Sequence, residues 1–325
     1  MADQKITQLT QVTSLSDSDL FVVSINVGTA PVTRAIKKSD AIPTSTGGGA
    51  KYPCDGRLTL ETGVPVSTTD QANKTTLYFT PYAGNQVGLY DGSSAWTTLS
   101  FAELSLNITA FTASKPYDIW IYNNAGTAAL DSTVWTSTTA RATALALQDG
   151  VLVKSGATTR RYLGTIYMDS ASKCQDTFKL RYVWNYYNRV TKPMYSLEAT
   201  ASWSYTTAAW RYQNNSSSNR LEMIVGVSES PIKIFFYETA YNSSSVLSAW
   251  GGIGEDTSTS YSGTAAYVSS GTANADCTVM AVLIKTPAVG FHYYAAIEYG
   301  AANTVFRGTH ATAAIKSPIL GEVPC

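Results

Sequence analysis

The feature that most constrains the fold is a series of short runs rich in β-branched and aromatic residues, separated by turn-forming residues. Asp149-Gly150 separates Leu145–Gln148 from Val151–Lys154, and a tight type I′ hairpin turn needs positive φ at both central residues. Similar turn residues at 91–94 and 123–126 separate further pairs of runs. Regularly spaced short strands with such turns predict antiparallel sheets in a sandwich or barrel rather than a parallel sheet.

The composition supports packed β-domains and argues against nucleic-acid binding. Charged residues make up 14% of the 325 residues, against roughly 25% in an ordinary soluble domain. Lys plus Arg and Asp plus Glu are both 23, so no excess of positive charge is present to bind phosphates. Hydrophobic residues are still 44%, which is enough to build cores, and the length indicates two or three domains.

We predict a mainly β protein in four segments. A small N-terminal β-hairpin module occupies residues 1–42, with a strand at Leu20–Ile25 and a returning strand at 32–36. A linker rich in Gly, Ser and Thr follows at 43–56. A middle antiparallel β-domain covers 57–192, and a C-terminal jelly-roll-like β-sandwich covers 193–325. Since so small a hairpin is unstable alone, it must pack on another protein or on its own copies, which predicts a homotrimer.

Two local predictions can be checked directly. The glycine-rich run Gly251-Gly252-Ile253-Gly254 has no Lys-Ser or Lys-Thr of a phosphate-binding loop and no preceding strand, so it is interpreted as a surface loop. The polar stretch 258–272 is also predicted to be a surface loop, and one helical turn is predicted near 138–145.

The sequence gives no sign of a membrane span, a secretory signal or a cysteine framework. No apolar run approaches the roughly 20 residues that a spanning helix needs, and the N-terminus lacks an apolar signal segment. The four cysteines are widely spaced, without a CxxC pair. They are predicted to be free thiols of a protein made in a reducing cytoplasm, with no metal site, no cofactor and no membrane insertion.

The chemistry of the side chains argues against an enzyme. Only two histidines, His292 and His310, are present, so a Ser-His-Asp triad must use one of them, and neither lies near a nucleophile signature. Glycoside hydrolysis needs two carboxyl groups at a set separation. The sequence alone pairs none of the carboxylates of the last region, so a depolymerase is the weaker alternative, and no catalytic residue is predicted.

The aromatic residues are the best candidates for a contact surface. The chain holds 21 Tyr and 7 Trp, and these side chains offer rigid area with a polar tip, which suits interfaces and sugar rings. The opposing interpretation is packing in the core or between subunits. The candidates for surface contact, chosen because they lie beside polar loops, are Trp210, Tyr212, Tyr241, Trp250 and Tyr261.

The first 40 residues contain three characteristic segments: Lys5-Ile6-Thr7-Gln8-Leu9-Thr10, Asp19-Leu20-Phe21-Val22-Val23 and 33–40. In this order they resemble a module found in many fibre and virion proteins of tailed bacteriophages. This resemblance implies that residues 1–42 anchor the chain to other virion proteins of the tail or capsid. The apolar residues expected to form this anchor are Ile6, Leu9, Leu20, Phe21, Val22 and Val23.

A second, longer block has landmarks that run from Arg57-Leu58-Thr59-Leu60 through Asp118-Ile119-Trp120-Ile121-Tyr122 to the segment 183–190. This block resembles a domain that recurs in structural proteins of phages. Together the two resemblances imply a structural virion protein, a fibre-type subunit of the tail or the head. We expect its C-terminal domain to face outward and to contact host surface polysaccharide through the aromatic residues named above. The alternatives are a capsid decoration or head-fibre protein and a dedicated glycan receptor-binding protein for host attachment. The expected location is the surface of the phage particle.

Overall fold

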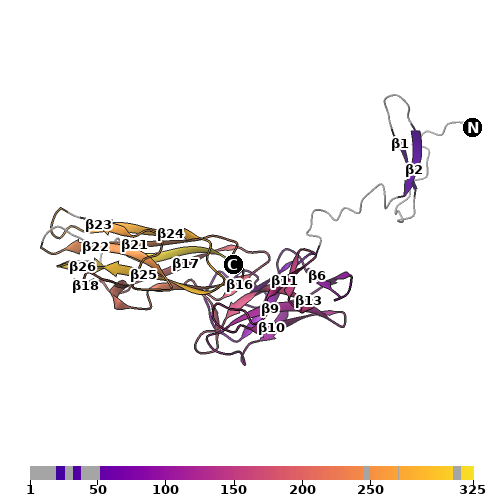
Figure 1. Ribbon diagram of the computed structural model, residues 1–325, viewed down its shortest axis with the longest axis horizontal. Coiled ribbons are helices and arrows are strands. Elements are labelled where there is room, and N and C mark those ends of the chain that lie inside the picture. The colour runs from indigo at the N-terminus through magenta and orange to yellow at the C-terminus, as the bar shows by residue number, and fades with distance from the viewer. Residues whose placement is uncertain (1–19, 26–31, 38–51, 245–248, 270, 310–315) are drawn as a thin grey trace, which may run out of the picture. The chain divides into compact units, whose positions relative to one another are not determined.

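A computed structural model describes residues 20–25, 32–37, 52–244, 249–269, 271–309 and 316–325 (Figure 1). The chain divides into an N-terminal unit, Met1–Lys51, and a main unit, Tyr52–Cys325. Strands dominate the described residues of both units, which confirms the predicted mainly β fold. Within the described ranges, no helix has the length and apolarity to cross a membrane.

The N-terminal unit contains the predicted hairpin. Strand β1 (Leu20–Ile25) pairs antiparallel with β2 (Val32–Lys37), from Leu20 opposite Lys37 to Ile25 opposite Val32. The expected anchor residues Leu20, Phe21, Val22 and Val23 belong to β1, whereas Ile6 and Leu9 lie outside the described residues.

The first part of the main unit is built from short antiparallel sheets. β10, β9, β13, β12 and β11 lie in that order, and β16 also pairs with β13. Smaller sheets have the orders β3-β5-β8 and β6-β7. The strands are β3 (Gly56–Thr59), β5 (Thr76–Pro81), β6 (Gln86–Tyr90), β7 (Trp96–Ser100), β8 (Leu104–Asn107), β9 (Pro116–Asn124), β10 (Thr127–Val134), β11 (Leu145–Gln148), β12 (Val151–Lys154), β13 (Ala157–Tyr167) and β16 (Val183–Asn185).

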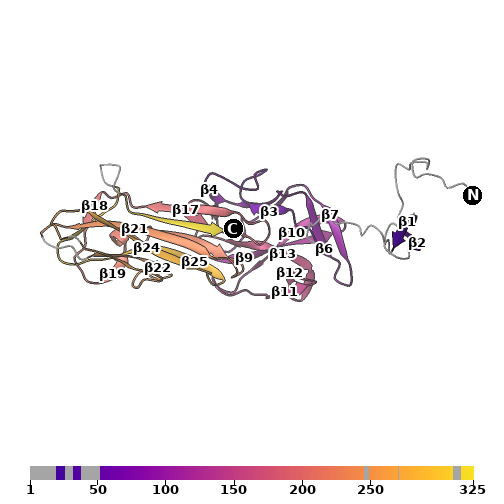
Figure 2. The same cartoon turned by 90° about the horizontal axis from the view of Figure 1, so that it is seen from above.

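The C-terminal part is a sandwich of two facing sheets (Figure 2). One sheet has the order β23-β22-β25-β20-β15-β14-β4, with β19 also on β25. Its strands are β4 (Gln71–Lys74), β14 (Cys174–Asp176), β15 (Leu180–Arg181), β19 (Trp210–Tyr212), β20 (Arg220–Val225), β22 (Ala249–Glu255), β23 (Ala266–Val268) and β25 (Gly290–Tyr299). The other has the order β17-β27-β21-β26-β18, with β24 also on β21. Its strands are β17 (Thr191–Leu197), β18 (Ser202–Ser204), β21 (Ile232–Asn242), β24 (Cys277–Lys285), β26 (Thr304–Arg307) and β27 (Pro318–Pro324), and a 3-10 turn, η2 (Gln213–Asn215), follows β19.

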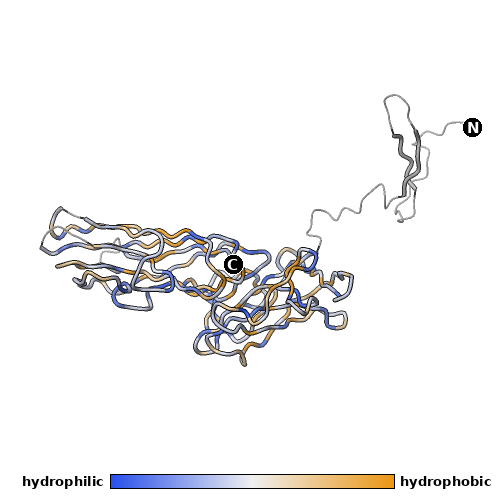
Figure 3. Tube along the Cα trace, viewed as in Figure 1, coloured by the Kyte–Doolittle hydropathy of each residue, from blue (hydrophilic) through white to orange (hydrophobic). Residues whose placement is uncertain are grey.

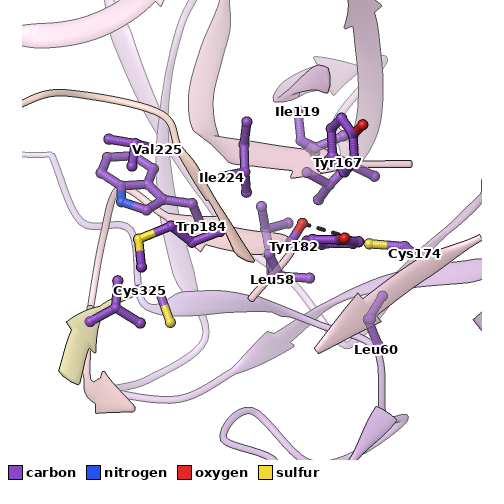
Figure 4. Close-up of a cluster of buried hydrophobic side chains, with 14 of the residues drawn as sticks. Leu58, Leu60, Ile119, Tyr167, Cys174, Tyr182, Trp184, Ile224, Val225 and Cys325 are labelled. Atoms are coloured by element: carbon purple, nitrogen blue, oxygen red, sulfur yellow. Dashed lines mark hydrogen bonds between the residues drawn. The ribbon is translucent and has the colours of Figure 1, made fainter. Parts of the chain in front are cut away.

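The two parts share a sheet and a core. β4, β14 and β15 precede the predicted boundary at 192/193, yet they continue the sheet of β20 and β25. Figure 4 shows Leu58, Tyr182 and Trp184 beside Ile224, Val225 and Cys325 in one buried cluster. The hydrophobic residues that Figure 3 colours orange recur along the strands of both parts. The main unit therefore replaces the two separate domains predicted at 57–192 and 193–325, because each part completes the other's core.

The end of the predicted linker also belongs to the main unit. Asp55 donates its backbone N–H to Gln86 O at 3.0 Å, and Gly88 N donates to Pro53 O at 2.8 Å. The division between the units falls between Lys51 and Tyr52, so residues 52–56 of the predicted linker 43–56 are part of the fold.

Three local predictions were wrong. Gly251, Gly252 and Gly254 lie inside strand β22 and not in a loop. The stretch 258–272 contains strand β23, which pairs with β22. Residues 138–144 form bends, and β11 begins at Leu145, so the predicted helical turn is absent from this stretch. In each case the pairing with a neighbouring strand or loop outweighed the local sequence preference.

Candidate functional site

Four aromatic residues lie opposite one another across four neighbouring strands of the sandwich. Trp210 on β19 is paired with Tyr299 on β25, and Tyr299 is paired on its other side with Trp250 on β22. Trp250 is paired in turn with Tyr267 on β23. Because directly opposed residues of an antiparallel sheet point to the same face, these rings form one continuous strip, which we call the aromatic row.

The aromatic row borders a cavity. Trp210, Trp250 and Tyr299 line it together with Tyr261 from the loop before β23, and its volume is about 230 Å³. The ring centres of Trp210 and Tyr299 are 5.4 Å apart, and those of Trp210 and Tyr261 are 5.5 Å apart. Trp250 is 38% exposed and Tyr261 50% exposed, so both rings are accessible to a ligand from solvent.

Gly252 allows the rings to approach the strand beneath them. A Cβ atom at this position would lie 3.1 Å from Trp210 Cζ3, 3.1 Å from Tyr261 Cβ and 3.3 Å from Ile297 Cγ1. Such contacts are tighter than ordinary van der Waals separation, so a side chain here would push the rings outward. The neighbouring Gly251 serves the other face of the strand, where a Cβ would lie 2.8 Å from Glu238 Cβ.

A buried carboxylate fixes the strands that carry the row. Glu298, next to Tyr299, accepts hydrogen bonds from Arg211 Nε at 2.7 Å, Trp203 Nε1 at 2.9 Å and Asn214 N at 3.2 Å. Charge-assisted bonds of this kind are among the stronger ones in proteins. Burial nevertheless raises the pKa of Glu298 to about 7, even though Arg211 acts in the opposite direction. The strands that carry the rings are therefore held rigidly, so little conformational entropy is lost when a ligand binds.

The structure brings together three of the five predicted contact residues. Trp210, Trp250 and Tyr261 line one cavity. Tyr212, also on β19, is half-buried, while Tyr241 lies on β21 of the other sheet with the Arg307 guanidinium 4.5 Å from its ring centre. Tyr212 and Tyr241 do not line this cavity.

Sequence reasoning missed Tyr299 and Tyr267. Tyr299 ends the aromatic-rich run 290–299, and the segment after it, Gly300-Ala301-Ala302-Asn303, is not a polar loop of the kind that selected Trp210 and Trp250. Tyr267 lay within a stretch interpreted as a polar loop, where only its pairing with Trp250 reveals a strand. The aromatic row depends on register between strands, and register is a property of the folded chain.

The other reactive side chains are held in structural contacts. His292 Nδ1 lies 2.7 Å from Asp256 Oδ2, and Nε2 lies 3.0 Å from Ala288 O. Burial lowers the pKa of His292, but its hydrogen bond to Asp256 outweighs that effect and raises it above the usual value. His310 lies outside the described residues. Across the described ranges, no group of three or more His, Cys, Asp or Glu side chains could hold a metal ion.

The cysteines are free thiols with little nucleophilic character where they are buried. Cys54, Cys174 and Cys325 are buried and Cys277 is half-buried, and none forms a disulfide. Burial raises the pKa of Cys54 to about 11, and it raises that of Cys174 further. Since the thiolate is the reactive form, these buried groups stay protonated at neutral pH.

Comparison with known proteins identifies no family. No family model matches the chain, and no curated protein matches it. Weak likeness is found to several solved structures, and two serve as examples. One is a structure of the Gt strain of infectious bursal disease virus, at 11% identity and a TM-score of 0.21, covering 88% of this chain and 81% of that one. The other is an exo-β-1,3-galactanase from Phanerochaete chrysosporium with β-1,3-galactotriose, at 10% identity and a TM-score of 0.15, covering 83% and 68%. At such scores neither likeness carries an argument about this chain.

Proposed function

We propose that this chain is a structural protein of a tailed-phage virion, of fibre type, and that its sandwich faces outward and binds a saccharide of the host surface. Two features support the virion part of the proposal: the resemblances at residues 5–40 and 57–190, and the division of the chain after Lys51. We expect a module that anchors the chain to form a unit separate from the one that contacts the host surface.

The observation that carries the binding part is the aromatic row with its cavity. A pyranose ring has an apolar face of C–H groups and a rim of hydroxyls, so it packs on aromatic faces and bonds to polar groups beside them. Trp210, Trp250, Tyr261 and Tyr299 supply faces around one cavity, and the two tyrosines add hydroxyls. Exposed apolar area of this kind marks a binding surface more often than it occurs by chance.

Replacing Trp250 by Ala should abolish most saccharide binding without unfolding the protein. The indole is 38% exposed and contacts Tyr267, at 4.7 Å between ring centres, so its removal leaves the core intact. We expect affinity for a recognised bacterial surface polysaccharide to fall at least about tenfold, equivalent to about 1.4 kcal/mol. The full-length protein is tested on an array of such polysaccharides, and the affinity for each one bound is then measured by calorimetry.

The matched control is Tyr195→Ala. Tyr195 is 42% exposed on β17 of the opposite sheet, so this variant removes similar aromatic area away from the row. It should bind as the unchanged protein does, with both variants melting within a few degrees of it. If Trp250→Ala binds normally, or if the unchanged protein binds no polysaccharide on the array, the binding part of the proposal fails.

The homotrimer predicted from the sequence belongs to the same proposal and can be measured directly. Met280 and Ile284 on β24 are 45% and 60% exposed, and they lie on one face of the strand because they are four residues apart. Copies packed through this face would remove that apolar area from water. Light scattering should give a mass of three times the 34.9 kDa chain. The Ile284→Lys variant should have a lower measured mass, closer to that of a single chain. A folded monomer at micromolar concentration would contradict the trimer.

The alternative location is the head, where the chain would be a capsid decoration or head-fibre protein. Labelling the protein with antibody and imaging intact particles distinguishes head from tail. The same experiment on a chain lacking residues 1–51 tests the anchor, because the truncated protein should stay folded and no longer join the particle.

A further inference from the structure

A second cavity, distinct from the aromatic row, lies where the two parts of the main unit meet. Its volume is about 480 Å³, and polar groups form most of its lining. The segment from Tyr167 at the end of β13 to Tyr182 forms one side. The start of β20, with the turn at Ser217 and Ser218, and Phe291 on β25 form the other.

The carboxylates in this cavity are already occupied by protein donors. Glu222 accepts hydrogen bonds from the hydroxyl of Tyr182 and from Arg220 Nε, the latter at 2.7 Å. Asp169 Oδ1 accepts from the backbone N–H groups of Ala171 and Lys173, both at 2.9 Å, and Asp169 Oδ2 accepts from Gln175 Nε2 at 2.5 Å. Both carboxylates are therefore satisfied before any ligand enters.

Lys179 also lies at this cavity, and its ammonium group takes no part in these carboxylate contacts. It lines the cavity and is half-buried, yet among the described residues its ammonium group has no carboxylate within salt-bridge distance. Burial lowers the pKa of Lys179, an effect that the nearby charge of Glu222 opposes and that of Arg220 reinforces. A partly desolvated ammonium without a partner is unfavourable, so this position favours an anionic group from outside the chain.

The remaining lining suits the body of a sugar. Phe291 is half-buried and stacks on Tyr167, with ring centres 4.3 Å apart, so one apolar wall is rigid. Ser114, Ser170, Ser217 and Ser218 place hydroxyl groups around the cavity. Hydroxyls donate and accept hydrogen bonds, which matches the mixed needs of a ring that carries several hydroxyl groups.

We propose that this cavity binds a saccharide unit that bears a carboxylate, with the acid group on Lys179 and the ring against Phe291. The site shares no residue with the aromatic row, and its test does not depend on the function proposed above. Binding here requires no covalent step and no cofactor.

The experiment uses the full-length protein and defined methyl glycosides. Calorimetry compares the glycosides of glucuronic acid, galacturonic acid and N-acetylneuraminic acid with the neutral glucoside and galactoside. At least one acidic glycoside should bind at least fivefold more tightly than the neutral ones, and its affinity should fall as salt rises, since salt screens the pair. Lys179→Gln should remove this preference, while Lys233→Gln, on β21 of the other sheet, should keep it.

Two further comparisons separate this site from the aromatic row. In a Trp250→Ala background, which removes the contribution of the row, the preference for the acidic glycoside should persist, while adding Ser218→Trp, at an exposed turn that lines the cavity, should remove it with the melting temperature preserved. The proposal is overturned if none of the three acidic glycosides binds, if neutral and acidic glycosides bind equally, or if Lys179→Gln binds like the unchanged protein.

Discussion

At pH 8 the Glu238→Gln variant should be more stable than the unchanged protein. Glu238 on β21 is fully buried, and neither of its carboxyl oxygens makes a hydrogen bond of good geometry among the described residues, although Gln213, Ser317 and the Thr239 backbone lie near enough to oppose the rise of its pKa. Burial is the largest cause that raises the pKa of Glu238 well above 4.5, and the charge of Glu298 adds to it. A neutral amide removes the cost of ionising this group, which we expect to be worth about 1–3 kcal/mol.

The sign of the pH dependence follows from the raised pKa. Below pH 4.5, the usual value for Glu238, the side chain is protonated in both folded and unfolded chains, so it adds no pH dependence. As pH rises above that value, the unfolded chain releases the proton and the folded chain retains it. The free energy of unfolding therefore falls with rising pH, up to the raised pKa. Urea unfolding at pH 4, 6 and 8 should show this fall, and Glu238→Gln should reduce it.

Glu298→Gln provides the contrast. Glu298 faces the same buried region but accepts from Arg211, Trp203 and Asn214. Removing its charge takes a partner from Arg211, whose side chain is 25% exposed, but it also removes the cost of ionising a group whose pKa burial raises to about 7. Because these two effects oppose each other, Glu298→Gln should gain less stability at pH 8 than Glu238→Gln does. If Glu238→Gln is destabilising at pH 8, or if its pH profile matches the unchanged protein, the assignment of the proton to Glu238 is wrong.

Local pattern predicted the strands best where a turn fixes both φ angles. Asp149 and Gly150 have φ values of 50° and 85°, and β11 and β12 pair directly around them, with Gln148 opposite Val151. The hairpin of β1 and β2 was predicted from the β-branched and aromatic residues of the first strand and the alternation of the second. In both cases the residues that determine the hairpin lie within a short stretch of sequence, and sequence patterns predict such local structure well.

The glycine-rich strand shows where local pattern fails. Composition predicts a loop at 251–254, because glycine lowers strand propensity. Each glycine instead makes room for another group: Glu238 of the other sheet beside Gly251, Trp210 and Tyr261 beside Gly252, and the nearby carbonyl of Thr257 beside Gly254. Contacts made only in the folded chain decide these positions, and one sequence without its fold does not reveal them.

Both candidate sites depend on long-range pairing. The choice of Trp210, Trp250 and Tyr261 rested on nearby polar loops, and the pairing of β19, β25 and β22 explains why these rings meet. The acidic-saccharide cavity had no signal of this kind, since its sides come from segments some forty to over one hundred residues apart. Lys179 looks like an ordinary surface lysine until the carboxylates around it are seen to be occupied.

Arg161→Met should destabilise the protein far more than Arg160→Met does. Arg161 is 2% exposed, and its guanidinium donates to Gly88 O at 2.7 Å, Pro53 O at 2.8 Å and Tyr52 O at 3.0 Å. The Arg161 guanidinium thereby connects the start of the main unit, at Tyr52 and Pro53, to Gly88 on β6. Without the guanidinium, these three carbonyl groups lose a hydrogen-bond donor. Because breaking such buried charged contacts is costly, we expect a loss of about 3–5 kcal/mol.

The neighbouring Arg160 is the matched control, because alternation along β13 puts the two side chains on opposite faces. Arg160 pairs with Asp131 at 3.0 Å, and these side chains are 29% and 40% exposed. Exposed pairs contribute at most about 1 kcal/mol, so Arg160→Met should change the unfolding free energy by no more than that. Urea unfolding compares the two, and amide exchange at Gly88, whose N–H donates to Pro53 O, should accelerate only in Arg161→Met. Equal effects of the two substitutions would mean that Tyr52 and Pro53 are held in place by contacts other than the Arg161 guanidinium.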